Sequence, residues 1–262
     1  MPEGHTIHRI ARDHTRDFVG QKIKTYSPQG RFRDEAKKIN GRCLESIDAW
    51  GKHLLYRMQG KHRLHIHLGL YGKFRSQTLP VAEPVGAVRL RAIGDNKAFD
   101  LNGPNTCELI DDARWAQITR RLGADPLRKD ANVDAAWSRI SRSRAAIATL
   151  LLNQSVIAGV GNVYRAEALH LLKIHPERPG KDLSRDDFDA MWKLLVKLLK
   201  TGVKYNRIII SDPNDIGKSR SRMNRQEALL VYKHEFCRRC DSPIESWSVG
   251  SRTIYACTTC QQ

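Results

Sequence analysis

The sequence predicts an α+β fold: an N-terminal helix with an antiparallel β sandwich, then a helical region, then a small C-terminal β-hairpin module. Three observations support this prediction. Short segments that alternate polar and apolar residues, broken by Gly, Pro and Asn, fill residues 22–110. Apolar residues recur at helical spacing over much of residues 111–201. Four of the six cysteines lie in the last 26 residues. We therefore expect domains over residues 1–115, 116–226 and 227–262.

The helices are predicted from the spacing of apolar residues and from signals at their ends. The first spans residues 3–18 and ends before Gly20. The longest follows Ser184, an expected N-cap, with Asp187 in its first turn. Residues 206–226, rich in Pro, Gly, Ser and Arg, are expected to form a basic loop or linker. The helices expected after the β region cover residues 112–122, 134–140, 145–154 and 184–201.

The charge of the chain indicates an anionic partner. Lys and Arg number 45 against 28 Asp and Glu, a formal charge of +17. Nucleic acid is the commonest polyanion in a cell, so we expect nucleic-acid binding rather than a merely solvated basic surface. An anionic membrane surface is the other candidate, but no basic amphipathic helix with an aromatic or leucine face is evident. No apolar run approaches the roughly 20 residues that span a bilayer, and no apolar signal segment opens the chain, so we expect a cytoplasmic protein.

The C-terminal cysteines have the spacing of a metal site. Cys237 and Cys240 form one Cys-x2-Cys pair, Cys257 and Cys260 form the second, and 16 residues separate the pairs. Each pair can hold one side of a tetrahedral ion, and four thiolates leave no open position, which is typical of structural zinc. A metal would also stabilise a segment too short to form its own apolar core. Two disulfides or redox pairs are the alternative, which the lack of an export signal disfavours.

A glycine-rich turn occupies the middle of the chain. In residues 153–165, Gly159 and Gly161 permit tight turns before a helix that starts near Asn162. Backbone N–H groups at a helix start favour a phosphate, and the Asn162 amide adds a further donor. The alternative is a turn that only links two helices.

Four motifs, in order along the chain, resemble those of the formamidopyrimidine-DNA glycosylase / endonuclease VIII family of base-excision repair enzymes. They are the N-terminal Met-Pro-Glu-Gly, the turn at residues 51–55, the helix–two-turn–helix at residues 158–165 and the zinc finger at residues 237–260. The resemblance implies a two-domain enzyme that binds damaged duplex DNA between its domains, removes an oxidised base and nicks the backbone. Single-stranded or bubble DNA is a further candidate partner. We expect a monomer, associated with the nucleoid through DNA, with one structural Zn²⁺ and no catalytic metal or organic cofactor.

The resemblance also implies catalytic roles for four residues. Pro2, once Met1 is removed, would attack C1′ of a nucleotide whose base is turned out of the stack. Glu3 would protonate the sugar ring oxygen, Lys52 would contact phosphate and assist the departing base, and Arg252 would grip phosphates beside the lesion. A secondary amine forms an iminium directly, and an α-amino group with a reference pKa of about 8 is partly neutral at cellular pH. Taken singly, three of these residues have ordinary alternatives: a proline at the first helical position, a carboxylate cap and a solvated turn lysine.

The DNA-contacting residues that the resemblance implies are Asn162, Arg121, His67, Gly69, Leu70, Tyr71 and Arg165. Leu70 and Tyr71 would enter the duplex where the base has left, and the flanking glycines favour an exposed tip over a buried strand pair. This pair resembles the endonuclease VIII branch, which acts on oxidised pyrimidines, whereas the guanine-directed branch more often has Met there. The chain departs from endonuclease VIII at Gly69, where relatives often have Gln, and at Thr6, where they often have Glu. For Arg121, a charge at a helix C-terminus is the ordinary alternative.

Some alternatives stay open from the sequence. His65 and His67 alternate onto one strand face without an evident third metal ligand, so we expect structural or phosphate-facing roles for them. The same fold acting on 8-oxoguanine or formamidopyrimidine is a second candidate function. A non-catalytic zinc-finger protein that binds damaged DNA is a third, and only Pro2, Glu3 and Lys52 distinguish the enzyme from it.

Overall fold

The computed structural model describes residues 2–250 and 252–262. The chain forms two compact units. The first, here called the β unit, covers Ile7–Arg121 together with the residues before Gly4. The second, the helical unit, covers Leu122–Gln262 together with Gly4–Thr6. The division thus falls after residue 121 and the cysteine-rich module groups with the helices, while the three-domain boundaries at 115 and 226 stay a prediction.

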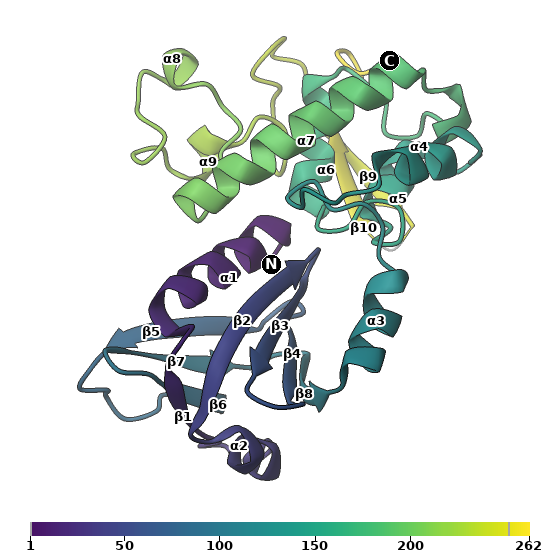
Figure 1. Ribbon diagram of the computed structural model, residues 1–262. Helices are drawn as coiled ribbons and strands as arrows, with labels where there is room; N and C mark the ends of the chain where they lie inside the picture. The colour runs from purple at the N-terminus through teal and green to yellow at the C-terminus, as the bar shows by residue number, and fades with distance from the viewer. Residues whose placement is uncertain (1, 251) are drawn as a thin grey trace. The chain divides into compact units, whose positions relative to one another are not determined.

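The described part of the β unit contains one antiparallel sheet of eight strands (Figure 1). Across the sheet their order is β5-β7-β6-β1-β2-β3-β4-β8. Strand β1 pairs with β2 over only two residue pairs and with β6 over three, so it joins two halves of the sheet. The strands are β1 (Lys22–Tyr26), β2 (Arg42–Trp50), β3 (His53–Met58), β4 (Arg63–His67), β5 (Lys73–Thr78), β6 (Val88–Ile93), β7 (Lys97–Asn102) and β8 (Thr106–Ile110).

Both halves of the sheet contribute side chains to one apolar core, which confirms the predicted sandwich. Helix α1 (Gly4–Phe18) closes this core with the apolar face expected from its sequence. His14 lies on that face, where its ring stacks on Phe99 with centroids 4.6 Å apart and its Nδ1 lies 2.7 Å from the Tyr56 hydroxyl. Burial lowers the pKa of His14 to about 4, so its neutral ring is part of the core.

The short helix α2 (Arg33–Ile39) was not predicted, because residues 22–110 were all assigned to strands and turns. Phe32, Ala36 and Ile39 are each 1% exposed and pack into the core of the β unit. Three apolar residues within about two helical turns do not establish a helical period in the sequence. Packing against the sheet therefore stabilises this helix.

The predicted helices of the middle region are confirmed, with ends that shift by a few residues. In the helical unit, α6 packs against α7, the long green helix of Figure 1. Their apolar faces form the second core of the protein. The helices after the sheet are α3 (Asp112–Arg120), α4 (Val133–Ser141), α5 (Ile147–Leu152), α6 (Asn162–Leu171), η1 (Gly180–Asp182), α7 (Arg185–Tyr205), α8 (Pro213–Ile216) and α9 (Arg225–Ala228).

Helix α7 begins as the sequence predicts. The Ser184 hydroxyl accepts a hydrogen bond from the Asp187 backbone N–H at 3.0 Å, and the Asp187 carboxylate accepts one from the Ser184 N–H at 3.3 Å. This capping box satisfies two donors that the first turn would leave without partners. The helix ends at Asn206, whose left-handed φ of 56° is one that asparagine tolerates.

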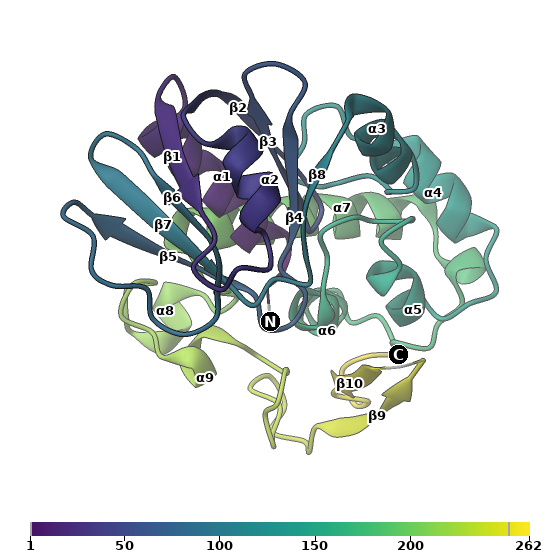
Figure 2. The same cartoon turned by 90° about the horizontal axis from the view of Figure 1, so that it is seen from below.

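The C-terminal module is a two-stranded hairpin of β9 (Glu245–Val249) and β10 (Arg252–Ala256), which confirms the predicted β-hairpin. Strand β10 packs beside α6 (Figure 2). Among the helices of residues 2–250 and 252–262, none is long and apolar enough to span a membrane.

Candidate functional site

The N-terminus places a buried carboxylate next to Pro2. Pro2 is half-buried, and Glu3 is 0% exposed. Glu3 occupies the N-cap position of α1, yet its side chain makes no capping hydrogen bond. Glu3 therefore stands at the start of the helix without a capping hydrogen bond. Met1, whose removal would free the Pro2 nitrogen, lies outside the described residues.

Gly4 and His5, which belong to the helical unit, pack against its glycine-rich turn. The Gly4 N–H donates to the Gly159 oxygen at 2.8 Å, and a Cβ on Gly4 would lie 2.9 Å from the Gly159 Cα. His5 packs edge-on against Tyr164, with ring centroids 5.4 Å apart. Burial lowers the pKa of His5 to about 4. Only glycine at position 4 permits this close approach. The contact fixes the position of Gly4, which directly follows Pro2 and Glu3.

The glycine-rich turn is shaped by one side chain. Gln154 accepts a hydrogen bond from the Gly159 N–H at 3.0 Å and donates to the oxygens of Leu152 and Val160, at 2.8 and 2.9 Å. Gly159 has a φ of +92°, which glycine adopts without strain. This arrangement sets the position at which α6 begins with Asn162.

Asn162 is joined to the C-terminal hairpin. Its amide Nδ2 donates to the backbone oxygen of Thr253 at 2.9 Å. Arg165, one turn along α6, donates to the same oxygen at 3.1 Å and to the Asn162 side-chain oxygen. Thr253 directly follows Arg252 in β10, and Arg252 is exposed. The two candidate phosphate ligands, Asn162 and Arg252, are therefore held together within the helical unit.

The structure corrects the prediction for Arg165. Its side chain is 0% exposed, and it also donates to the Ala148 oxygen at 3.3 Å. Direct contact with DNA would need surface that this guanidinium lacks. Its physical role is instead to satisfy buried oxygens and orient Asn162.

Glu167 binds the backbone of residues 230–232, the segment that precedes the C-terminal hairpin. Its carboxylate, 0% exposed, accepts hydrogen bonds from the backbone N–H groups of Leu230, Val231 and Tyr232 at 3.0, 3.1 and 2.9 Å. Burial raises the pKa of Glu167 to about 7. The sequence does not predict a role for Glu167, because a Glu in a helix gives no sign that it will be buried.

The four cysteines predicted as ligands lie together. Their Sγ atoms are all within 4.8 Å of one another. Cys240 is 3.4 Å from both Cys257 and Cys260, and Cys237 is 3.9 Å from Cys260. A zinc ion about 2.3 Å from four tetrahedral sulfurs would set them about 3.8 Å apart, so this donor set fits such an ion. No disulfide forms between the cysteines of the described residues, and the cluster could bind a metal ion.

Lys52 lies in a tight turn of the β unit, as predicted. It follows Gly51, whose φ is +58°, in the two-residue connection between the paired residues Trp50 and His53. Burial, and then the neighbouring His67, His65 and Lys52, lower the pKa of His53 to about 3. A half-buried Lys52 thus stands at the end of a rigid hairpin.

A chain of histidines extends along the sheet from this hairpin. His53 Nδ1 lies 3.0 Å from His65 Nε2, and His65 Nδ1 lies 2.9 Å from the Glu108 carboxylate. His65 is 3% exposed, which agrees with the structural role expected for it. His67 packs against His53 with ring centroids 4.8 Å apart, and burial lowers its pKa. His53 and Glu108 were missed, since only strand pairing brings them beside His65.

The predicted tip between β4 and β5 is exposed. Leu70 is 46% and Tyr71 is 86% exposed, although Leu68 just before them is 2% exposed. Gly69 has a φ of +66°, and a Cβ on Gly72 would lie 2.3 Å from the Leu68 oxygen. The glycines on both sides thus force the sharp turn that presents the two apolar side chains to solvent. Arg121 is likewise exposed, at the C-cap of α3.

Comparison with known proteins identifies the family. The sequence profile of the Formamidopyrimidine-DNA glycosylase N-terminal domain matches residues 1–107, and that of the Formamidopyrimidine-DNA glycosylase H2TH domain matches residues 122–214. Endonuclease 8 1 of Mycobacterium tuberculosis is 45% identical over 267 residues and covers 100% of both chains. The formamidopyrimidine-DNA glycosylase of Lactococcus lactis subsp. lactis is 28% identical, again over 100% of both chains.

Solved structures agree with these matches. The Lactococcus lactis Fpg in complex with DNA containing N7-benzyl-Fapy-dG superposes with a TM-score of 0.83 at 26% identity, over 100% of both chains. The same protein in complex with DNA containing an abasic site gives a TM-score of 0.82 at 25% identity, over 99% of both chains. Two matched domains and a relative 45% identical over the whole chain show that this protein belongs to the formamidopyrimidine-DNA glycosylase / endonuclease VIII family of DNA glycosylases and AP lyases, which act in base-excision repair of damaged DNA.

Proposed function

We propose that the protein is a bifunctional glycosylase and AP lyase that removes oxidised pyrimidines through a Schiff base on Pro2 and then breaks the strand by β,δ-elimination. The observation that supports this most is Glu3, which is fully buried beside Pro2 and makes no capping hydrogen bond to its helix. Burying a carboxylate costs free energy, so a buried one beside the proposed nucleophile is expected to serve the chemistry.

Pro2 acts as the nucleophile once Met1 is removed. Its nitrogen lone pair forms a bond to C1′ as the bond from C1′ to the base breaks, and Lys52 donates the proton that the departing base takes up. The nitrogen then loses its own proton. Glu3 protonates the ring oxygen, the bond from C1′ to that oxygen opens, and the nitrogen lone pair forms the C=N bond of the iminium.

The iminium then drives strand breakage. Its positive charge draws electrons from C2′, so a C2′ proton is removed and the 3′ phosphate leaves. Loss of a C4′ proton from the conjugated product expels the 5′ phosphate in turn. Glu3 shuttles protons between these steps, and Arg252 stabilises the departing phosphate charge.

Binding to DNA is assigned to groups on both units. In the helical unit, Asn162 and Arg252 hold phosphates beside the lesion, while Arg165 bonds Asn162 and the backbone of Thr253, the residue after Arg252, from the interior. In the β unit, Arg121 and His67 contact the sugar–phosphate backbone of the DNA. There, the tip of Gly69, Leu70 and Tyr71 enters the duplex where the base has left, which its exposure supports.

We assign the four-cysteine cluster to structural zinc. Its sulfur spacing fits that ion, and four thiolates leave no position for substrate. When bound, zinc crosslinks the module and thereby holds β10, with Arg252, in place. Treatment with a strong chelator is expected to release about one zinc per chain and to weaken DNA binding, and added zinc should restore it.

The choice of oxidised pyrimidines rests on two observations. The full-length relative at 45% identity is named Endonuclease 8 1, whereas those named formamidopyrimidine-DNA glycosylase are 27–29% identical. The exposed pair Leu70 and Tyr71 supplies an aliphatic wedge and a stacking ring.

Borohydride trapping tests the proposal directly. Untagged protein is incubated with duplexes that contain 5-hydroxyuracil, thymine glycol, 8-oxoguanine or an abasic site, and the covalent product is measured. We expect trapping on the abasic and oxidised-pyrimidine duplexes, with slower reaction on 8-oxoguanine. A residue retained before Pro2 should abolish trapping but leave binding intact, because it blocks only the nitrogen.

Two results would count against this assignment. If Pro2→Gly were trapped as fast as the unaltered protein, another amine would be the nucleophile. Faster cutting at 8-oxoguanine than at 5-hydroxyuracil would assign the protein to the guanine-directed substrates instead. Lys200→Ala, which removes an exposed lysine of α7, serves as a control for loss of charge.

A further inference from the structure

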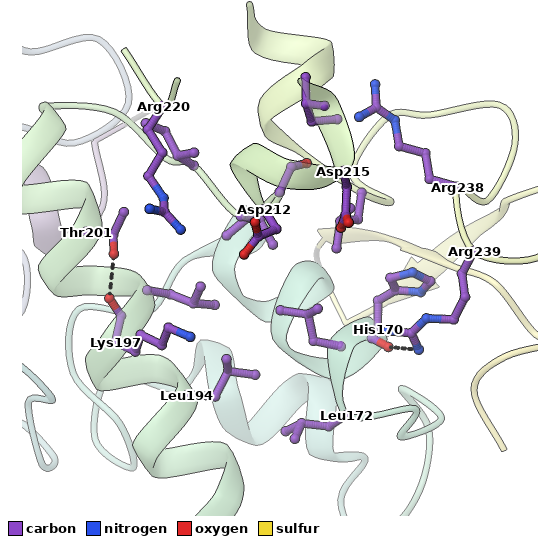
Figure 3. Close-up of a pocket in the computed structure, with 17 residues that line it drawn as sticks. His170, Leu172, Leu194, Lys197, Thr201, Asp212, Asp215, Arg220, Arg238 and Arg239 are labelled. Atoms are coloured by element: carbon purple, nitrogen blue, oxygen red, sulfur yellow. Dashed lines mark hydrogen bonds between the residues drawn. The ribbon is translucent and has the colours of Figure 1, made fainter. Parts of the chain in front are cut away.

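The helical unit contains a pocket that the proposed chemistry does not use (Figure 3). Its volume is about 890 Å³. Leu194, Lys197, Leu198 and Thr201 of α7 line it, at spacings that put them on one face of the helix. The other walls come from the end of α6, the segment after α7 and the cysteine-rich module. None of the candidate catalytic or DNA-contacting residues lines this pocket.

The floor of the pocket is aliphatic and only partly covered. No aromatic ring other than that of a histidine lines it, so it lacks the flat apolar surface on which nucleobases usually stack. Aliphatic surface that stays half-exposed is instead suited to aliphatic side chains. The half-buried residues of the floor are Leu171, Leu172, Leu194, Ile210, Ile216 and Leu230.

The rim carries more positive than negative charge. Figure 3 shows Asp212 and Asp215 between Arg220 on one side and Arg238 on the other. Lys197 and Arg239 also line the pocket, which makes four cations against two carboxylates. Within residues 2–250 and 252–262, none of these six side chains forms an ion pair. Among these residues, the Arg238 and Arg239 side chains donate only to the backbone oxygens of Glu227 and His170, which leaves their charge without a carboxylate partner. Asp212 accepts from the backbone N–H of Asn214.

A buried hydroxyl adds an independent sign of a ligand. Ser211 lines the pocket and is 2% exposed, and its Oγ has no hydrogen-bond partner among the described residues. A buried hydroxyl without a partner costs free energy, which a ligand with a backbone N–H or C=O would recover.

From these observations we propose that the pocket binds an extended peptide segment of a partner protein, one in which acidic and aliphatic side chains alternate. Alternate side chains of an extended peptide point to opposite sides, so its aliphatic groups meet the floor while its carboxylates meet the cationic rim. The peptide backbone hydrogen-bonds to Ser211. A nucleic-acid strand fits less well, since its continuous phosphates would approach Asp212 and Asp215.

Fluorescence anisotropy tests this with a fluorescein-labelled octapeptide of alternating aspartate and leucine and the full-length, zinc-loaded protein. We expect saturable binding with a Kd on the order of 1–100 μM. The double variant Lys197→Glu, Arg220→Glu should bind at least about tenfold more weakly, because it reverses two rim charges. The same variant should gain affinity for a matching lysine–leucine octapeptide.

The matched control is Lys200→Glu, Arg225→Glu, which reverses two exposed charges that do not line the pocket. It should keep the affinity of the unaltered protein, and far-UV circular dichroism and zinc content should show that both variants fold. Equal weakening in the two variants would overturn the proposal, as would equal binding of an aspartate–serine peptide. Displacement of the peptide by oligothymidylate as readily as by unlabelled peptide would reassign the pocket to nucleic acid.

Discussion

The side-chain amide of Asn162 donates a hydrogen bond of 2.9 Å to the backbone oxygen of Thr253, which joins the start of α6 to strand β10. The buried guanidinium of Arg165 donates to that same oxygen and to Asn162 itself. Arg252 lies one residue before Thr253. One interior arginine thus bonds both the Asn162 side chain and the strand that carries Arg252.

Loss of Arg165 should therefore weaken DNA binding without removing any group that touches DNA. Hydrogen bonds to a charged group contribute about 1.5–3 kcal/mol, so Arg165→Met should reduce affinity for a duplex with an abasic-site analogue by about tenfold or more. Gel-shift titration at fixed salt measures the effect. Arg142→Met, which removes an exposed arginine of the same unit, is the control for charge. An affinity equal to that of the control would show that Arg165 orients nothing that binds DNA.

The contact between Gly4 and Gly159 makes a prediction about catalysis. A methyl group at position 4 would overlap the Gly159 backbone, so Gly4→Ala should displace residue 4 from this contact. The displacement should also shift Pro2 and Glu3, which directly precede residue 4. We expect the rate of Schiff-base trapping to fall by about tenfold or more, since small misplacement of reacting groups is costly. Gly41→Ala, at a φ of +75° with no neighbouring atom, adds backbone strain but no overlap and should trap normally. Trapping by Gly4→Ala at the unaltered rate would mean that this docking does not position the nucleophile.

The exposed tip should matter for base removal but not for stability. Replacing Leu70 and Tyr71 with alanine removes side chains that touch little of the protein, so the free energy of unfolding should change by less than about 0.5 kcal/mol. Release of 5-hydroxyuracil should slow, while cutting at a preformed abasic site should slow less, because no base has to leave the stack. Val85→Ala, which removes another exposed apolar side chain, is the control. Equal slowing on both substrates would argue against a wedge.

Glu167 predicts a dependence of stability on pH. Its folded-state pKa of about 7 exceeds its ordinary value of 4.5, so the folded protein binds a proton that the unfolded chain releases between these values. The contribution of Glu167 to stability should therefore decrease as the pH rises from about 4.5 to 7 and then level off. Urea midpoints of the unaltered protein and of Glu167→Gln at pH 5 and pH 8 measure it.

The difference in urea midpoint between the unaltered protein and Glu167→Gln reports the effect of Glu167 alone, because all other titrating groups are common to both proteins. The buried histidines act in the opposite direction, because burial lowers the pKa values of His5 and His14 to about 4. Their contribution to the stability of the folded protein therefore increases as the pH rises from about 4 to about 6.5. The advantage of the unaltered protein over Glu167→Gln should be larger at pH 5 than at pH 8. An advantage that grows toward pH 8 would show that the three backbone N–H groups, rather than burial, dominate the ionisation of Glu167.

The sequence by itself determined the features that depend on neighbouring residues. The capping box of Ser184 and Asp187, the cysteine spacing and the exposed tip all follow from interactions within a few residues, and all are present in the structure. The family motifs likewise lie in short, continuous segments. The fold class could be predicted because alternating and helical periods reflect which face of each element is buried.

Only the tertiary structure decided which polar side chains are buried. Arg165 and Glu167 lie in a helix that packs on its entire circumference, so groups expected at the surface become internal hydrogen-bond partners of the hairpin. His53 meets His65 because β3 pairs with β4 in one register. The pocket beside α7 arises where segments distant in sequence meet. A local pattern reports the period of an element, whereas the partner that covers each face is set by long-range packing.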